Sequence, residues 1–249
     1  MIRTRDADRV RTVTLDRPDR RNALTPEGLD ALDDAVTDPP TPVVYLHGAG
    51  AAFCAGADLD AVGAVARESE TDPSAAAEFA RLGQRVARAI EESPAVVVAG
   101  IDGAARGGGV ELALACDLRV ATPEATFAEP GATFGLFGAW GGTHRLERVV
   151  GHGDALDLAL SGRVVDAEEA LRMGLVSRVR RDPHVVAREV ADNDGPALDE
   201  IKRLMRPVES VADREERERA AFARLVEEHA AALGGGTGRE GEGNPENER

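Results

Sequence analysis

Three consecutive glycines followed by a glutamate form the first pattern that could do chemistry. The stretch VVVAGIDGAARGGGVELALACD, residues 96–117, is typical of a buried strand that runs into Gly107 to Gly109 and then into a helix. Glycines at a helix N-terminus leave backbone N–H groups free to hold an oxygen that carries negative charge. Glu111 follows Gly108 by three residues, about one helical turn along the same side. The alternative is structural: close packing at the glycines and a first-turn acid that favours the helix dipole.

A second strand-to-helix turn, CAGADLDAV at residues 54–62, offers the same kind of backbone donor. Two such turns could each supply one N–H group to one oxygen, as a developing thioester enolate requires. The preceding residues superficially resemble a dinucleotide fingerprint, because Gly48 and Gly50 follow a strand. The third glycine position is Phe53 and no helix opens there, which disfavours NAD binding.

The loop FAEPGATFGLFGAWGGT, residues 127–143, is rich in glycine and has a single carboxylate, Glu129. Loops of this composition often let the backbone approach a ligand closely. We interpret Glu129 either as an auxiliary acid or as a solvated carboxylate that hydrogen-bonds the loop. Trp140, the only tryptophan, is consistent with a pocket wall or with ordinary core packing.

Histidine and cysteine offer weaker candidates. His47 with Cys54 would suggest a thiol hydrolase, but no third orienting group is apparent and Cys54 sits in an apolar run. His144, near a helix start, is either a catalytic acid or a surface or capping residue. Cys54 and Cys116 are expected to be buried free thiols. No His, Cys and Asp residues have metal-ligand spacing, so we expect no metal site.

Short apolar runs alternate with helical patterns, which indicates an α/β architecture. The continuous apolar runs VVYL and VVVAGI are typical of strands buried on both faces. The predicted strands are 10–16, 43–48, 96–103, 118–123 and 175–179. The predicted helices include one that starts at the Thr25 cap, one over 75–92, and one from the Asp166 and Glu169 capping-box pattern to Gly174.

After Pro183 the sequence predicts helices only, at 184–193, 196–206 and 211–233. From residue 234 onward there is no apolar residue to bury, so this segment is expected to be disordered. We therefore divide the chain into an α/β core over 1–182, a C-terminal helical region over 183–233 and a disordered tail over 234–249.

Charge and composition exclude some functions. The formal net charge is −15, and Lys202 is the only lysine, which argues against nucleic acid as a partner. The excess of acids favours a salt-adapted (halophilic) source, whereas a GC-rich genome would explain only the preference for arginine over lysine. None of the apolar runs reaches the roughly 18 residues of a membrane span. The charged start, MIRTRDADRVRTV, lacks a signal region, so we expect a cytoplasmic protein with no membrane partner.

Five stretches together resemble the successive signatures of the enoyl-CoA hydratase/isomerase (crotonase) family. They are LDRPDRRNALTPEGLDAL, AGAAFCAGADLDAV, IDGAARGGGVELALACDLRVAT, ATFAEPGATFGLFGAWGGTHRLERVVG and LSGRVVDAEEALRMGLVSRV. They occur in the family's order, over about residues 10–180. The resemblance implies a spiral of ββα repeats and a C-terminal helical region used in trimer formation, as a homotrimer or a hexamer of two trimers. It also implies an acyl-CoA thioester substrate, with coenzyme A as part of the substrate and no separate cofactor.

The resemblance also implies roles for individual residues. The oxyanion hole would be the backbone N–H groups of Ala57 and Gly108, and Glu111 matches the first of two catalytic glutamates. Arg21 would face the phosphates of coenzyme A. The other positions assigned to substrate binding are Ala23, Leu24, Ala55, Gly56, Asp58, Leu59, Gly107, Pro130, Gly131 and Trp140.

The chain departs from the hydratases at the second catalytic glutamate, which in the family directly follows a proline. Here that position follows Pro130 and is Gly131. Glu111 could therefore work alone, with a bound water, or with Glu129. In a strand-like segment Glu129 would share a face with residue 131, since it lies two positions earlier.

These residues favour the hydration of 2-trans-enoyl-CoA to 3-hydroxyacyl-CoA in the breakdown of fatty acids or related acids. One alternative is a Δ3–Δ2-enoyl-CoA isomerase or another reaction through the same enolate. Another is a catalytically weak acyl-CoA-binding protein, which is consistent with Gly131. RNA binding is disfavoured by the negative charge. The acidic segment over 66–78 is expected at the pocket rim and does not indicate which acyl chain is bound.

Overall fold

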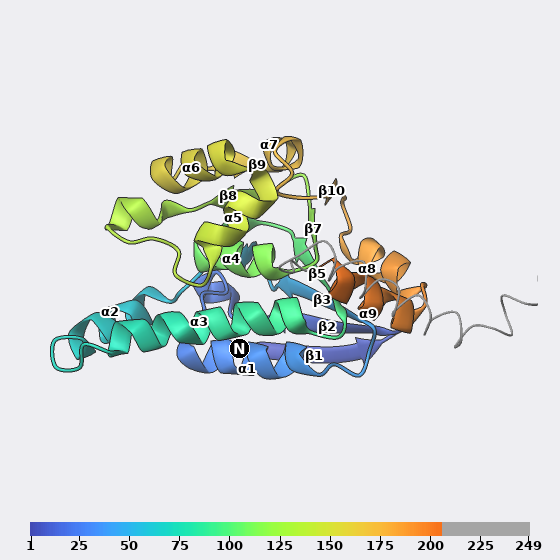
Figure 1. Ribbon diagram of the computed structural model, residues 1–249, viewed down its shortest axis with the longest axis horizontal. Helices are drawn as coiled ribbons and strands as arrows, with labels where there is room; N and C mark the ends of the chain where they lie inside the picture. Colours follow the sequence, from blue (N-terminus) through green and yellow to red (C-terminus); the bar gives the residue numbers. More distant parts are fainter. Residues whose placement is uncertain (206–249) are drawn as a thin grey trace, which may run out of the picture. The chain divides into compact units, whose positions relative to one another are not determined.

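From β3 to β8, consecutive strands join two different sheets in turn, and helices follow each pair (Figure 1). The six-stranded sheet has the order β1-β2-β3-β5-β7-β10, and the four-stranded sheet has the order β4-β6-β8-β9. In β3–β4, β5–β6 and β7–β8, a strand of the large sheet is thus followed by a strand of the small sheet and then by helical structure, whereas β1 and β2 both belong to the large sheet. These repeats confirm the α/β spiral of ββα turns that was predicted from the sequence.

The computed structural model describes residues 1–205, of which Met1–Asp199 form one compact unit. The strands are β1 (Ile2–Ala7), β2 (Val10–Leu15), β3 (Val43–Gly48), β4 (Ala52–Cys54), β5 (Val96–Ile101), β6 (Ala104–Arg106), β7 (Leu118–Ala121), β8 (Thr126–Ala128), β9 (Val165–Asp166) and β10 (Arg178–Val179). The helices are α1 (Pro26–Thr37), α2 (Leu59–Glu68), α3 (Ala75–Glu92), α4 (Gly108–Ala115), α5 (Gly142–Val150), α6 (His152–Ser161), α7 (Ala167–Arg172), α8 (His184–Ala191) and α9 (Gly195–Leu204). Two short 3-10 helices, η1 (Pro18–Arg20) and η2 (Pro130–Phe134), lie in loops.

The central strands of the large sheet are buried on both faces, as their continuous apolar sequence predicts. In β3, Val44 and Leu46 face the main core beneath α1 and α3, whereas Val43 and Tyr45 face a second core cluster that includes residues of α8. The strands β2, β3, β5, β7 and β10 pair in parallel, and only β1 is antiparallel in this sheet. Parallel strands end at the same edge of the sheet, so the turns that follow β3–β4 and β5–β6 can meet there.

Helix starts follow the capping signals that were read from the sequence. Thr25 accepts a hydrogen bond from Gly28 N at 3.3 Å, and Asp166 accepts one from Glu169 N at 2.8 Å. Each side chain satisfies one of the backbone donors that a helix N-terminus leaves unpaired. Gly174, at φ +79°, follows α7 in the left-handed conformation that favours glycine.

Some elements differ from their predicted bounds. The strand predicted over 96–103 ends at Ile101, and only Arg178–Val179 of the segment 175–179 form a strand. Strand β1, helix α6 and the two- and three-residue strands of the small sheet were not predicted. For the strands of the small sheet the reason is their length, since so short a strand has no measurable periodicity. The helix predicted over 211–233 and the tail over 234–249 lie outside the described residues. None of the helices within 1–205 is long and apolar enough to cross a membrane.

Candidate active site

The two strand-to-helix turns that were singled out in the sequence lie against each other. A Cβ atom placed on Gly56 would lie 2.9 Å from Gly108 N and 2.7 Å from the carbonyl oxygen of Arg106. Gly56 has φ +85°, so both its conformation and its surroundings favour glycine. The close approach brings the backbone around Ala57 next to the N-terminus of α4, as the oxyanion-hole prediction requires.

The backbone N–H of Ala57 is left free by a short parallel ladder between two loop segments. Leu24 N donates to Gly56 O at 2.8 Å, and Asp58 N donates to Leu24 O at 2.9 Å. Because the N–H groups of successive residues in such a ladder point to opposite sides, the N–H of Ala57 faces away from Leu24. It has no acceptor among the described residues.

The second donor comes from the start of α4. Gly107 adopts φ +48° and ψ −120°, which fits glycine, and its N–H donates to Ala128 O at 3.0 Å. Gly108 is the first residue of the helix, so its N–H has no intrahelical acceptor. The positive end of the helix dipole adds to the attraction for an anionic oxygen.

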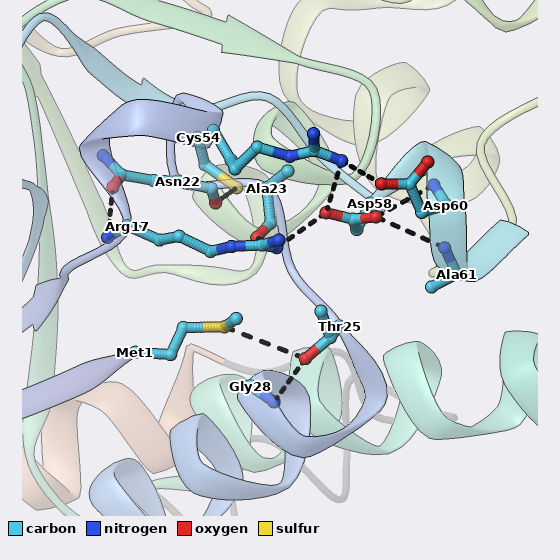
Figure 2. Close-up of polar contacts among 11 residues, drawn as sticks. Met1, Arg17, Asn22, Ala23, Thr25, Gly28, Cys54, Asp58, Asp60 and Ala61 are labelled. Carbon is cyan, nitrogen blue, oxygen red and sulfur yellow. Dashed lines mark hydrogen bonds and ion pairs between the residues drawn. The ribbon is translucent and has the colours of Figure 1, made fainter.

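Asn22 and Asp58 make polar contacts on the segments beside Ala57, and Figure 2 shows Asp58 with Arg17 and with the start of α2. Asn22 is buried in a left-handed conformation, and its side-chain amide donates to Ala49 O at 2.9 Å and Ala52 O at 2.7 Å. Asp58 caps α2 through Asp60 N at 2.9 Å and forms an ion pair of 2.6 Å with Arg17. Its side chain is therefore occupied by structural contacts, and at this position only the backbone is open to a substrate.

Glu111 lies in the first turn of α4 with a side chain that is 2% exposed. Its Oε1 accepts hydrogen bonds from Trp140 N at 2.8 Å and Gly142 N at 2.7 Å. Burial raises the pKa of Glu111, although these two hydrogen bonds and the charge of Arg145 oppose the rise. Its Oε2 has no hydrogen-bond partner among the described residues, so one oxygen is fixed and the other remains for proton transfer.

The glycines of the 127–143 loop make room for this carboxylate. A Cβ on Gly138 would lie 2.8 Å from Glu111 Cδ, and a Cβ on Gly142 would lie 2.7 Å from Oε1. Arg145 also stabilises the loop, since it donates to Trp140 O at 3.0 Å and pairs with Glu91 at 2.6 Å. The backbone of this loop therefore approaches Glu111 itself, a contact that was not predicted from the sequence.

Trp140 is a core residue whose ring packs against Gly108 at the N-terminus of α4. Its ring lies between Gly83 of α3 and Gly108, where added Cβ atoms would come within 2.1 and 2.3 Å of ring atoms. It is buried in the main core cluster and makes an edge contact with Phe79. Of the two interpretations of Trp140, core packing is the one that the structure supports.

Glu129 lies between β8 and η2, and Gly131 is the second residue of η2. Glu129 precedes Pro130, and a Cβ on Gly131 would lie 2.9 Å from Phe137 Cα and 3.1 Å from Leu136 O. The segment turns into a 3-10 helix at Pro130, so the strand alternation expected to align Glu129 with residue 131 is wrong. Glu129 is nevertheless buried, and its carboxyl is close enough to Glu111 to be affected by that charge.

The other residues predicted to bind substrate differ in how exposed they are. Arg21 is exposed in a left-handed turn, at φ 51°. Burial lowers the pKa of Arg106, and the positive charge of Arg21 lowers it further. Leu24 is fully buried in the core, whereas Leu59 is exposed at the start of α2. Ala23 and Ala55 belong to the segments on either side of the loop ladder.

The histidine and cysteine alternatives find no support in the geometry. His47 Nε2 hydrogen-bonds Thr14 Oγ1 at 2.9 Å, whereas the thiol of Cys54 donates to Asn22 O at 3.2 Å. Burial raises the pKa of the Cys54 thiol to about 12, which keeps it protonated. Both cysteines are buried free thiols, as predicted, and His144 is exposed on α5. In residues 1–205 no cluster of His, Cys, Asp and Glu could hold a metal ion.

Comparisons with known proteins agree with the fold and the paired turns. The family model of the enoyl-CoA hydratase/isomerase family matches residues 5–225. A crotonyl-CoA hydratase from Syntrophomonas wolfei is 38% identical over 69% of this chain and 66% of its own length. A short-chain-enoyl-CoA hydratase from Clostridium acetobutylicum is 36% identical over 74% of this chain and 71% of its own length. The crystal structure of an enoyl-CoA hydratase from Thermoplasma volcanium has a TM-score of 0.85 at 28% identity and covers 95% of this chain and 97% of that one.

Two adjoining glycine turns at the end of ββα repeats define a protein of the crotonase fold. The chain belongs to the enoyl-CoA hydratase/isomerase family.

Proposed function

We propose that this chain is an acyl-CoA enzyme that hydrates 2-trans-enoyl-CoA to 3-hydroxyacyl-CoA in the breakdown of fatty acids or related acids. The thioester oxygen accepts hydrogen bonds from the N–H groups of Ala57 and Gly108, which stabilise the enolate as negative charge develops. The water oxygen bonds to C3 while Glu111 takes a proton from it, and C2 then receives a proton. No separate cofactor takes part, because coenzyme A belongs to the substrate.

The observation that carries this proposal is the convergence of two free backbone donors with one buried carboxylate. A Cβ added to Gly56 would lie only 2.9 Å from Gly108 N, and Glu111 lies about one helical turn beyond Gly108. The relatives from Syntrophomonas and Clostridium, which are named hydratases, support the same reaction. Arg21 with Arg106 forms a positive region that suits the phosphates of coenzyme A.

The test is a crotonyl-CoA hydration assay of the wild-type chain and Glu111→Gln. We expect the variant to lose about 10²–10⁴-fold in kcat, the usual contribution of a positioned acid–base group. Binding of the unreactive analogue butyryl-CoA, followed by calorimetry, should change little. Equal rates for the two proteins would overturn the proposal. If the variant loses activity as expected, a panel of CoA thioesters tested on the wild type identifies the preferred acyl chain.

A second candidate function is Δ3–Δ2-enoyl-CoA isomerisation, which Gly131 favours because this position lacks the second catalytic glutamate of the hydratases. Isomerisation moves a proton between two carbons and adds no water. The assay should therefore include 3-enoyl and 2-enoyl thioesters in ¹⁸O-labelled water. Label in the product supports the hydratase, and double-bond migration without label supports the isomerase. Measurable acyl-CoA binding with no turnover on any thioester would instead support the weak-binding alternative.

We also propose a homotrimer, or a hexamer of two trimers, formed through the C-terminal helical region over 183–233. Light scattering of the full chain would distinguish a monomer, a trimer and a hexamer.

The net charge of −15 supports a halophilic source, for which the expected observation is a melting temperature that rises with added KCl. A cytoplasmic location is likewise a proposal, and fractionation of the source cells tests it.

A further inference from the structure

Glu129 is a buried carboxylic acid that no contact in the described structure accounts for. Its side chain is 8% exposed, and its Oε1 is buried without a hydrogen-bond partner within residues 1–205. An unpaired buried polar atom costs roughly 1–3 kcal/mol, more if it is charged, so its presence calls for an explanation. Within residues 1–205 the two other buried acids have partners: Asp58 pairs with Arg17, and Glu111 accepts hydrogen bonds from two backbone donors.

Glu129 lines a hollow of about 170 Å³ whose other lining residues come from η2, α5, α6 and the loop before α5. Gly138 and Gly142, the two glycines that surround the Glu111 carboxylate, form part of the same lining. The other side chains there are mainly apolar, including Leu146, Ala155 and Leu156. The hollow has room for more than one water molecule, each of which needs about 10–15 Å³. Glu129 therefore borders a space that reaches the loop around Glu111.

The other acid that lines this hollow, Glu147 on α5, is exposed and pairs with His152 at 3.0 Å. Gly131 lacks a side chain, and the backbone of Leu136 and Phe137 closes the space that a larger residue would need. Burial raises the pKa of Glu129 well above its usual value, and the negative charge of Glu111 raises it further. When the charge of one carboxyl group acts on another in an apolar setting, the pair favours a state in which one group holds a proton and the other is charged.

We propose that Glu129 is the proton donor of this enzyme, a neutral acid that takes over the task of the glutamate missing at Gly131 and works as a pair with ionised Glu111. The inference rests on the proposed function and adds the residue that completes it. In hydration, the oxygen of water bonds to C3 and one water proton goes to Glu111. The proton of Glu129 then forms the new C2–H bond as the enolate electrons return to carbon. Transfer of the proton from Glu111 to Glu129 restores both groups.

The kinetic test compares the wild-type chain with Glu129→Gln and with the control Glu124→Gln, an exposed acid of the same segment. We expect Glu129→Gln to lower kcat for crotonyl-CoA by about 10²–10⁴-fold with KM changed little, and Glu124→Gln to behave as wild type. Solvent deuterium should enter C2 more slowly in the Glu129 variant. Wild-type kcat in Glu129→Gln would overturn the inference while leaving the proposed function in place. A wild-type chain without hydratase or isomerase turnover would overturn both.

The pH profile separates a proton donor from a structural side chain. The other titratable groups that line this hollow are Glu147 on α5 and His152 on α6. Glu111 on α4 acts on Glu129 through its charge, and Arg145 on α5 acts on Glu111 in the same way. Since the donor must be protonated, wild-type kcat should fall as pH rises through the pKa of Glu129. The residual activity of Glu129→Gln should lack this alkaline decline. A decline that persists unchanged in the variant would contradict the assignment.

Infrared spectroscopy provides a readout that needs no turnover. At neutral pH the full-length wild type should show a protonated-carboxyl band that is absent from Glu129→Gln and present in Glu111→Gln. Circular dichroism confirms that each variant is folded. A band that survives in Glu129→Gln, or disappears in Glu111→Gln instead, would place the proton elsewhere and overturn the inference.

Discussion

The backbone N–H of Gly142 donates a hydrogen bond of 2.7 Å to Oε1 of Glu111. This contact joins the first residue of α5 to the first turn of α4, and Trp140 N donates to the same oxygen at 2.8 Å. Two backbone donors on one oxygen orient the carboxylate and leave Oε2 available. The position of the catalytic carboxylate therefore depends on the loop before α5 as much as on its own helix.

The first prediction concerns that orientation. In Gly142→Ala the new methyl group would lie 2.7 Å from both Cγ and Oε1 of Glu111, so the flexible glutamate must move. We expect kcat to fall at least about tenfold, because misplaced acid–base groups lose much of their effect, while stability changes by only about 1 kcal/mol. Gly153→Ala is the matched control, since no atom lies within 4 Å of the added carbon. Unchanged kcat in Gly142→Ala would contradict the orienting role.

The second prediction concerns the missing glutamate. Gly131→Glu should not restore a second catalytic carboxylate, because its Cβ would lie 2.9 Å from Phe137 Cα. We expect destabilisation by about 1–3 kcal/mol, typical of an overpacked site, and no gain in hydratase rate. Ala132→Glu, an exposed neighbour on the same 3-10 helix, should change stability by less than about 0.5 kcal/mol. Thermal unfolding and crotonyl-CoA assays check both points, and a faster Gly131→Glu enzyme would contradict the prediction.

The fold and the donor turns could be predicted because they depend on local patterns. Apolar runs of four to six residues in β3 and β5, and glycines at the starts of helices, are visible in any short window. The resemblance over about residues 10–180 then placed Ala57, Gly108 and Glu111 in one site. The ladder between Leu24 and Ala57 gives this expectation its structural basis.

The contacts between distant segments could not be predicted in this way. Asn22 contacts Ala49 and Ala52, and Glu111 contacts Trp140 and Gly142, each across more than twenty residues. No local pattern specifies such pairs, although an asparagine in the RRNAL turn is a signal for left-handed backbone. The strand-based argument for Glu129 failed because Pro130 starts a 3-10 helix. Glu129 is buried beside residues of η2 and α6 that are distant in sequence, and periodicity in the sequence does not predict such packing.

The third prediction concerns Asp58, whose ion pair holds the Ala57 turn. Burial alone would raise the pKa of Asp58, but the hydrogen bond from Arg17 and those from the α2 backbone lower it overall. Asp58→Asn keeps the helix cap and removes the charge, so we expect a loss of about 1–3 kcal/mol at neutral pH. Asp60→Asn, at an exposed ion pair with Arg20, should have almost no effect.

The pH dependence of that loss follows from the lowered pKa. The stabilisation by Asp58 is fully present above the unfolded carboxyl pKa of about 3.9 and disappears as pH falls through the folded value. Urea unfolding of the wild type and Asp58→Asn should therefore give curves that differ at pH 7 and converge in acid. A difference that stays constant down to the acid end would show that the charge is not its cause.

The last prediction concerns the raised pKa of Glu129 and tests it through the pH dependence of the free energy of unfolding. Its raised pKa means that the folded chain binds a proton more tightly than the unfolded chain does. Between the unfolded value of about 4.3 and the folded value, each pH unit should therefore cost the wild type about 1.4 kcal/mol relative to Glu129→Gln. Glu129→Gln should match the wild type most closely in acid and become the more stable protein as pH rises. Urea unfolding from pH 4 to 8 measures the difference, with Glu124→Gln as a control that should follow the wild type throughout. Parallel curves for Glu129→Gln and the wild type would mean that Glu129 ionises normally in the folded protein, and the buried-acid assignment would fail.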